Sequence, residues 1–195
     1  MTSDESDSDA ERAIPEIVAA HFEEFAFLWG ARKVALRSAE LDWNAAVALE
    51  NRAVVHLDGL SLAGDGALAL LQECLVADDA KTVFAAAYSL LRMNDVKMTA
   101  DIMQRFRNAK GAQLRGLTEA ISQTFSQSLL LDLRDALVCP PASVAVAAAE
   151  VLAMNSRLDA MSGRLAELLA DSDPAVRRAA WRVVAIVDSS AGTGH

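Results

Sequence analysis

The chain contains few aromatic residues, few prolines and few glycines, and these shortages narrow the choice of fold. Aromatic side chains make up 5% of the 195 residues and hydrophobic residues 53%, so a core must be built from aliphatic side chains. Four prolines and nine glycines are few for the many turns of a β protein, and alternating runs of β-branched residues are scarce. Repeated runs of alanine favour helices in close contact. These features predict an all-α fold.

Basic residues are also in the minority, and this limits the possible partners. The chain has 18 Lys and Arg against 27 Asp and Glu, which gives a net charge of −9. Nucleic acid is therefore not an expected partner, because phosphate binding needs clustered Lys and Arg. Part of the acidity lies in the opening stretch "TSDESDSDAE", and we expect residues 1–12 to form a disordered tail.

Cysteines and long apolar runs are equally scarce. Cys74 and Cys139 are the two cysteines, and without CxxC spacing they are typical of reduced core thiols. No apolar run approaches the roughly 20 residues of a membrane span, and no secretory signal opens the chain. We therefore expect a cytoplasmic protein without a membrane partner.

A short apolar pattern recurs four times in the second half of the chain. Three apolar residues follow one another at spacings of three and then four, and the copies begin 31, 30 and 32 residues apart. This spacing predicts one face of a helix in each copy. The four sets are Val83, Ala86 and Leu90; Leu114, Leu117 and Ile121; Val144, Ala147 and Val151; and Val176, Ala179 and Val183.

Second apolar helices are predicted between these copies, around Ile102, Leu133 and Leu165, and turn signals separate them. Two helices in each repeat of about 30 residues are typical of an α-solenoid. We expect about three and a half repeats over residues 77–188, with the last copy incomplete, and a flexible C-terminus over residues 189–195.

The N-terminal third does not show the repeat and predicts a helical cap over residues 13–76. Its first helix is expected to open at Pro15. A second helix is expected over about residues 42–58, followed by a turn around Gly59 and a helix over about residues 64–76.

Two parts of the chain resemble known proteins. The stretch with Asp173-Pro174, Val176-Arg177 and Ala179-Ala180 resembles the first helix of HEAT-like repeats. The segments "IVAAHFEEFAFLW" and "VVHLDGLSLAGDGALAL" resemble a bacterial family of HEAT-like-repeat proteins that has no assigned activity. The matching residues are His21, Glu24, Leu28 and Trp29, then His56, Leu57, Asp58, Gly59, Leu60, Ala63 and Gly64.

The resemblance has implications for function and for length. Members of the family are often encoded near type VI secretion components, so it implies a link to that pathway. They also tend to be longer, so it implies that this chain is a short form.

One group of residues could support metal or proton chemistry. His21 and Glu24 share a face of their helix, and antiparallel packing would bring His56 and Asp58 close to them. Two imidazoles and carboxylates can hold a divalent metal or move a proton. The alternative is structural, because His21 continues the apolar stripe of the helix and buried histidines usually form hydrogen bonds.

Candidate partner-binding residues lie in the repeats. Trp29, Trp43 and Trp181 are either core or interface anchors, and exposed aromatic and Arg side chains are enriched at binding hot spots. Solvated faces explain basic clusters equally well. The residues selected for partner binding are Trp181, Arg177, Arg178, Arg182, Arg105 and Arg107.

Three functions follow from these patterns. The first is a non-catalytic protein–protein interaction module, namely a scaffold, adaptor or effector-neutralising protein, with no catalytic residue and no cofactor. The second is a metal-binding protein or enzyme centred on His21, Glu24, His56 and Asp58. The third is self-assembly as a homodimer through the uncapped C-terminal repeat.

Overall fold

The described part of the chain is built from helices, which confirms the all-α prediction. The computed structural model describes residues 4–38, 43–93, 95–158 and 163–191, with side chains from Pro15 to Ser189. The helices are α1 (Asp4–Ala35), α2 (Trp43–Ala63), α3 (Asp65–Cys74), α4 (Ala80–Arg92), α5 (Val96–Asn108), α6 (Gly111–Gln123), the 3₁₀ turn η1 (Gln127–Leu129), α7 (Leu130–Val138), α8 (Ala142–Met154), α9 (Gly163–Leu169) and α10 (Pro174–Ala191).

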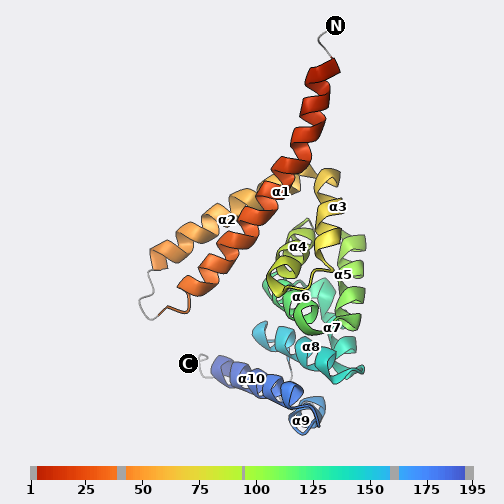
Figure 1. Cartoon of the computed structure of the whole chain (residues 1–195). Helices are drawn as coiled ribbons and strands as arrows, with labels where there is room; N and C mark the ends of the chain where they lie inside the picture. The colour runs from red at the N-terminus through yellow and green to blue at the C-terminus, as the bar shows by residue number, and fades with distance from the viewer. Residues whose placement is uncertain (1–3, 39–42, 94, 159–162, 192–195) are drawn as a thin grey trace.

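The four helices that carry the recurring apolar pattern pack side by side in a row. Helix α4 contacts α6, α6 contacts α8, and α8 contacts α10, while α5, α7 and α9 pack against this row (Figure 1). All twelve residues of the four apolar sets are buried, with exposed fractions between 0% and 9%. The sequence pattern therefore identified the buried face of each helix in the row.

Small residues let the helices of the row approach closely. A Cβ atom on Gly116 of α6 would lie 2.6 Å from the carbonyl oxygen of Ala80 and 2.8 Å from Cβ of Val83, both on α4. The alanine runs at 85–87 and 147–149 are also buried, as the sequence predicted. The backbones of α4 and α6 are therefore separated at this point by the hydrogen atoms of a glycine.

Aspartate side chains begin three of the helices. Asp79 accepts a hydrogen bond from the backbone N–H of Thr82 at 2.8 Å, and this bond lowers the pKa of the Asp79 carboxyl group. Asp95 accepts hydrogen bonds from two N–H groups at the start of α5. Asp173, directly before α10, accepts one from the N–H of Ala175 at 2.8 Å.

Helices α1 and α2 form an antiparallel hairpin, and α1 also packs against α3 and α4 (Figure 1). The predicted turn at Gly59 is wrong, because α2 continues through this residue to Ala63. The chain turns instead at Gly64, whose φ of 54° favours glycine. Gly59 has a packing role, since a Cβ atom there would lie 2.7 Å from Cε1 of His21.

The ends of the chain are more helical than we expected. Helix α1 begins at Asp4, so residues 4–12 are helical where we predicted disorder, and Pro15 lies inside the helix. Acidic residues at a helix N-terminus interact favourably with the helix dipole, which is consistent with this extension. Helix α10 runs to Ala191, past the predicted boundary at residue 188, while residues 1–3 and 192–195 lie outside the described residues.

Length and hydrophobicity determine whether a described helix could span a membrane. No single helix among them is long and apolar enough to cross a membrane. Helices α2 and α3 reach the required length and composition only together, and they meet at an angle of 116°.

The contact at Gly116 gives the first prediction. Gly116→Ala should lower the free energy of unfolding by about 1–3 kcal/mol, because the new methyl group overlaps the backbone of α4. Thermal and urea denaturation measure this loss. Gly30→Ala is the matched control, since its Cβ would meet only the Lys81 side chain at 3.5 Å and alanine favours the helix. Equal effects of the two substitutions would contradict the close-packing explanation.

Candidate functional site

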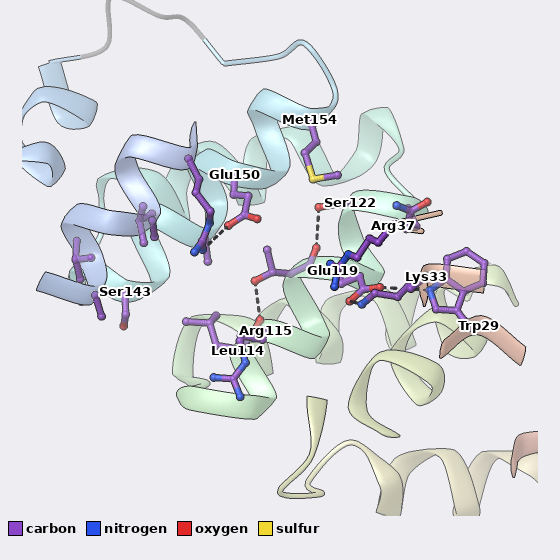
Figure 2. A pocket seen from close by; sticks show the side chains of 18 of the residues that line it. Trp29, Lys33, Arg37, Leu114, Arg115, Glu119, Ser122, Ser143, Glu150 and Met154 are labelled. Atoms are coloured by element: carbon purple, nitrogen blue, oxygen red, sulfur yellow. Dashed lines mark hydrogen bonds and ion pairs between the residues drawn. The ribbon is translucent and has the colours of Figure 1, made fainter. Parts of the chain in front are cut away.

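An open groove of about 820 Å³ lies between the second half of α1 and the row formed by α6, α8 and α10 (Figure 2). Apolar side chains from all four helices line it. They are Trp29, Leu36, Leu114, Val146, Ala147, Met154, Val176 and Ala179. The groove therefore brings together residues from the two ends of the described chain.

Basic residues outnumber acidic residues in the groove. Its lining contains five cationic side chains and three carboxylates, whereas the whole chain has a net charge of −9. The cationic residues are Arg32, Lys33, Arg37, Arg115 and Arg182, and the carboxylates are Glu119, Glu150 and Asp173. The groove is a local region of positive charge on an acidic protein.

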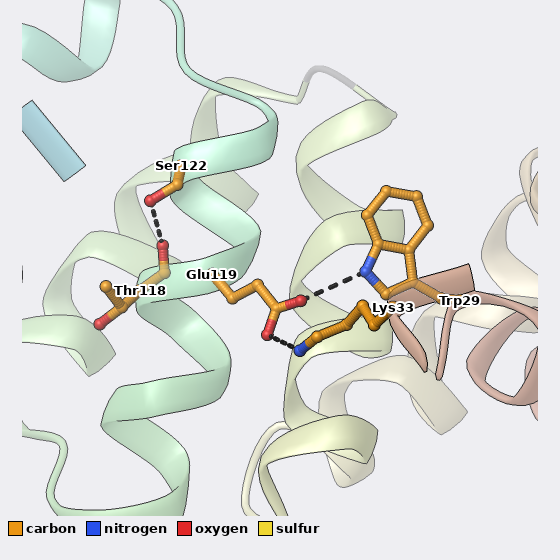
Figure 3. A network of polar contacts seen from close by, with 5 residues as sticks. All are labelled: Trp29, Lys33, Thr118, Glu119 and Ser122. Atoms are coloured by element: carbon orange, nitrogen blue, oxygen red, sulfur yellow. Dashed lines mark hydrogen bonds and ion pairs between the residues drawn. The ribbon is translucent and has the colours of Figure 1, made fainter. Parts of the chain in front are cut away.

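Glu119 of α6 links the two walls of the groove. Its carboxylate accepts a hydrogen bond from Lys33 Nζ at 2.6 Å and another from Trp29 Nε1 at 3.3 Å (Figure 3). Thr118 and Ser122 lie beside it on α6, and their hydroxyl groups donate to carbonyl groups within the same helix. Glu119 thus positions α1 relative to α6 and uses two polar groups of α1 to do so.

Trp29 packs against an aromatic cluster. Its ring centroid lies 5.1 Å from that of Phe84 and 5.2 Å from that of Tyr88, and Phe25 completes the cluster. Half-burial in this cluster raises the pKa of the Tyr88 hydroxyl group. The guanidinium of Arg32 lies 4.9 Å from the centroid of the Trp29 ring.

The cationic side chains of the groove differ in their partners. Arg32 pairs with Glu50 at 2.9 Å and Lys33 with Glu119 at 2.6 Å, while Arg182 lies 3.7 Å from Glu150. Among the described residues, Arg37 and Arg115 have no carboxylate partner. Both side chains are exposed. Their charges are therefore available to a ligand in the groove.

The predicted partner-binding residues of α10 have different roles. Trp181 is 62% exposed and is therefore not a core residue, and Arg182 lines the groove. Arg178 is exposed. Arg177 turns back on its own chain, since its Nη1 donates to the carbonyl oxygens of Asp171 and Ser172 at 2.6 and 2.9 Å. This geometry gives Arg177 a structural role in the turn before α10.

The predicted residues of α5 lie outside the groove. Arg105 pairs with Asp101 on its own helix at 2.8 Å, and Arg107 pairs with Asp132 of α7. Trp43 is 65% exposed at the start of α2. The structure therefore does not gather the selected tryptophan and arginine residues into one surface.

Only part of the predicted metal set comes together. His21 Nδ1 lies 3.1 Å from His56 Nδ1, which confirms that antiparallel packing brings the imidazoles together. Glu24 and Asp58 are both exposed. Within the described residues, no three His, Cys, Asp or Glu side chains are grouped closely enough to hold a metal ion. The pair instead forms a hydrogen bond between α1 and α2, as the structural alternative expected.

The prediction of core thiols is wrong for Cys139, whereas Cys74 packs against the hydrophobic core. Cys74 is half-buried and Cys139 is exposed, and neither forms a disulfide. Burial raises the pKa of the Cys74 thiol, with smaller contributions from Glu73 and Asp79.

Sequence reasoning missed the basic residues at the end of α1. Arg32 and Lys33 follow Trp29 at spacings of three and four and so share its side of the helix, and Arg37 follows in the turn after α1. That spacing was the signal that could have identified Arg32 and Lys33. Comparison of the chain with models of protein families, with curated proteins and with solved structures found no match.

The network at Glu119 gives the second prediction. Glu119→Ala removes both acceptors and should lower the free energy of unfolding by about 1 kcal/mol, because the ion pair is partly exposed. Glu119→Gln keeps one acceptor oxygen for Trp29 and should cost less. Chemical denaturation followed by Trp fluorescence measures both. Glu167→Ala breaks an exposed pair within α9 and serves as the control.

The contact between His21 and Gly59 gives the third prediction. In the wild-type chain, Gly59→Ala should displace the His21 ring and break its hydrogen bond with His56. In a His21→Ala background, Gly59→Ala should stabilise the protein by about 0.5–1 kcal/mol, because alanine favours the helix. A double-mutant cycle by urea denaturation should show a coupling energy of about 1–2 kcal/mol. The same effect in both backgrounds would show that the two residues do not interact.

Proposed function

We propose that the chain is a HEAT-like α-solenoid that binds another protein in the groove between α1 and the row of α6, α8 and α10. The observation that carries this proposal is a groove that combines an apolar lining with Arg37 and Arg115, which have no carboxylate partner among the described residues. The side-by-side row of helices and the 30–32-residue period support the solenoid assignment. In this proposal the N-terminal hairpin forms one wall of the binding site, in addition to its predicted role as a helical cap.

The composition of the groove supports a protein ligand. Binding surfaces combine an apolar centre with Arg and aromatic residues at positions where they lose solvent on binding. Met154 and Leu36 are the more accessible apolar residues of the lining, and Arg37 and Arg115 line the same groove. The groove is also open and spans four helices, as an extended segment or helix of a partner requires.

The charges define the chemistry of the partner. Arg37 and Arg115 have no carboxylate partner among the described residues, and Arg182 lies at a long distance from Glu150. A partner segment with carboxylates beside an apolar stripe would pair with these groups and cover the apolar floor. We therefore propose an acidic amphipathic helix as the ligand.

The resemblance to HEAT-like proteins adds a biological context to this proposal. It supports a partner from a type VI secretion pathway, and in this proposal the chain acts as an adaptor, a chaperone or an effector-neutralising protein in the cytoplasm. The proposed activity is non-catalytic binding.

Reversal of two groove charges gives the fourth prediction. Arg37→Glu/Arg115→Glu should abolish capture of the partner from a bacterial lysate, because it places carboxylates against an acidic ligand. Wild-type and variant proteins are compared as tagged baits, and the proteins that co-purify are identified by mass spectrometry. A partner recovered with wild type is then purified, and its dissociation constant is measured for each variant.

The matched control carries the same change in charge at another surface. Arg52→Glu/Arg134→Glu alters two exposed arginines on α2 and α7 that do not line the groove. This variant should bind like wild type. Equal loss of the partner in both variants would show a non-specific charge effect, and unchanged binding in both would place the binding site elsewhere.

A further inference from the structure

The start of α1 is acidic, whereas the groove is basic. Its first turns carry the acidic residues Asp4, Glu5, Asp7, Asp9 and Glu11. In Figure 1 these turns extend beyond α2 and α3. Helices in proteins gain most of their stability from packing, so a helical segment that extends beyond its neighbours is suited to a partner surface.

The segment also carries an apolar pattern of helical period. Ala10, Ala13, Ile14 and Ile17 follow one another at spacings of three, one and three, which is typical of one side of an amphipathic helix. The side chain of Ile17 is 56% exposed. Acidic residues and an apolar stripe thus occur in one helical segment, and the groove presents basic residues and an apolar floor.

The same chain cannot bring these two surfaces together. The groove residues of α1 begin at Trp29, about 18 residues after Glu11 on one continuous helix. At 1.5 Å per residue this separation is about 27 Å along the helix axis. A straight α1 therefore holds its acidic end away from its own groove, and the occupant must come from a second molecule.

We propose that the acidic N-terminal segment of one copy, residues 4–17, docks in the basic groove of a second copy. Its carboxylates pair with Arg37 and Arg115, and its apolar residues contact Met154, which is 49% exposed, and the half-buried Leu36. This inference rests on the groove being the docking surface proposed above. Self-association then competes with partner binding, since both use one site.

The proposed dimer contact lies in the groove and not at the uncapped C-terminal repeat, which the sequence suggested as a dimer surface. The exposed side of α10 carries Arg178, Trp181, Arg182 and Asp188, and Trp181 is its one large exposed apolar residue among those described. The groove combines its arginines with apolar residues of α1, α6, α8 and α10, whereas the α10 surface combines Arg178 with Trp181 alone.

A charge exchange between two full-length variants tests this proposal. The groove variant is Arg37→Glu/Arg115→Glu, and the segment variant is Asp7→Lys/Asp9→Lys/Glu11→Lys. Sedimentation equilibrium should show a concentration-dependent dimer for wild type and a dissociation constant raised about 100-fold for each variant alone, because like charges then meet. An equimolar mixture of the two variants should restore the dimer, since opposite charges meet again in both contacts.

Controls separate this outcome from general effects of charge. Arg52→Glu/Arg134→Glu should dimerise like wild type, and circular dichroism should show that all variants remain helical. Higher salt should weaken the wild-type dimer. A wild-type monomer at every concentration overturns the proposal. A dimer that survives both reversals also overturns it and points to the apolar residues Trp43, Val47 and Leu62 exposed on α2.

The test distinguishes failure of this inference from failure of the proposed function. If wild type is monomeric but the groove variant loses its partner, self-docking fails and partner binding stands. If the charge exchange restores a dimer but no captured protein depends on Arg37 and Arg115, self-docking stands and the proposed function fails.

Discussion

Gly116 brings the backbones of α4 and α6 into direct contact, and the placement of α6 opposite α1 depends on this contact. The carbonyl oxygen of Ala80 occupies the space that a side chain at Gly116 would need. Helix α6 is thereby held against α4, while α1 packs against α4 as well. Glu119, one turn beyond Gly116, can then reach Trp29 and Lys33 of α1. The walls of the groove depend on this arrangement, since α1 and α6 supply its two sides.

The distribution of charge explains how an acidic chain presents a basic groove. Several carboxylates are used in the folded structure: Asp79, Asp95 and Asp173 accept backbone hydrogen bonds at helix starts. Other carboxylates belong to the first turns of α1, outside the groove. The arginines of the groove come from three different helices and meet few of these acids. The net charge therefore describes the whole chain correctly but does not predict the basic character of the groove.

The two proposals make the groove a shared site with two competing ligands. A partner helix and the N-terminal segment of a second copy would need the same arginines and the same apolar floor. Occupancy then depends on their relative concentrations and affinities, because two ligands that exclude one another lower each other's apparent affinity. Self-docking would also cover the side chain of Met154, which is 49% exposed.

Local patterns in the sequence determined the helices and their buried faces, and the tertiary structure decided the site. Spacings of three and four identified Val83, Leu114, Val144 and Val176 as buried residues, because one turn of a helix is enough to define a face. The turn at Gly59 was wrong because the need for glycine there comes from His21, 38 residues earlier in the chain. The groove could not be predicted from local sequence patterns either. Arg37, Arg115 and Arg182 meet only when distant helices pack together, and packing also left Trp181 exposed and kept Glu24 and Asp58 away from the histidine pair.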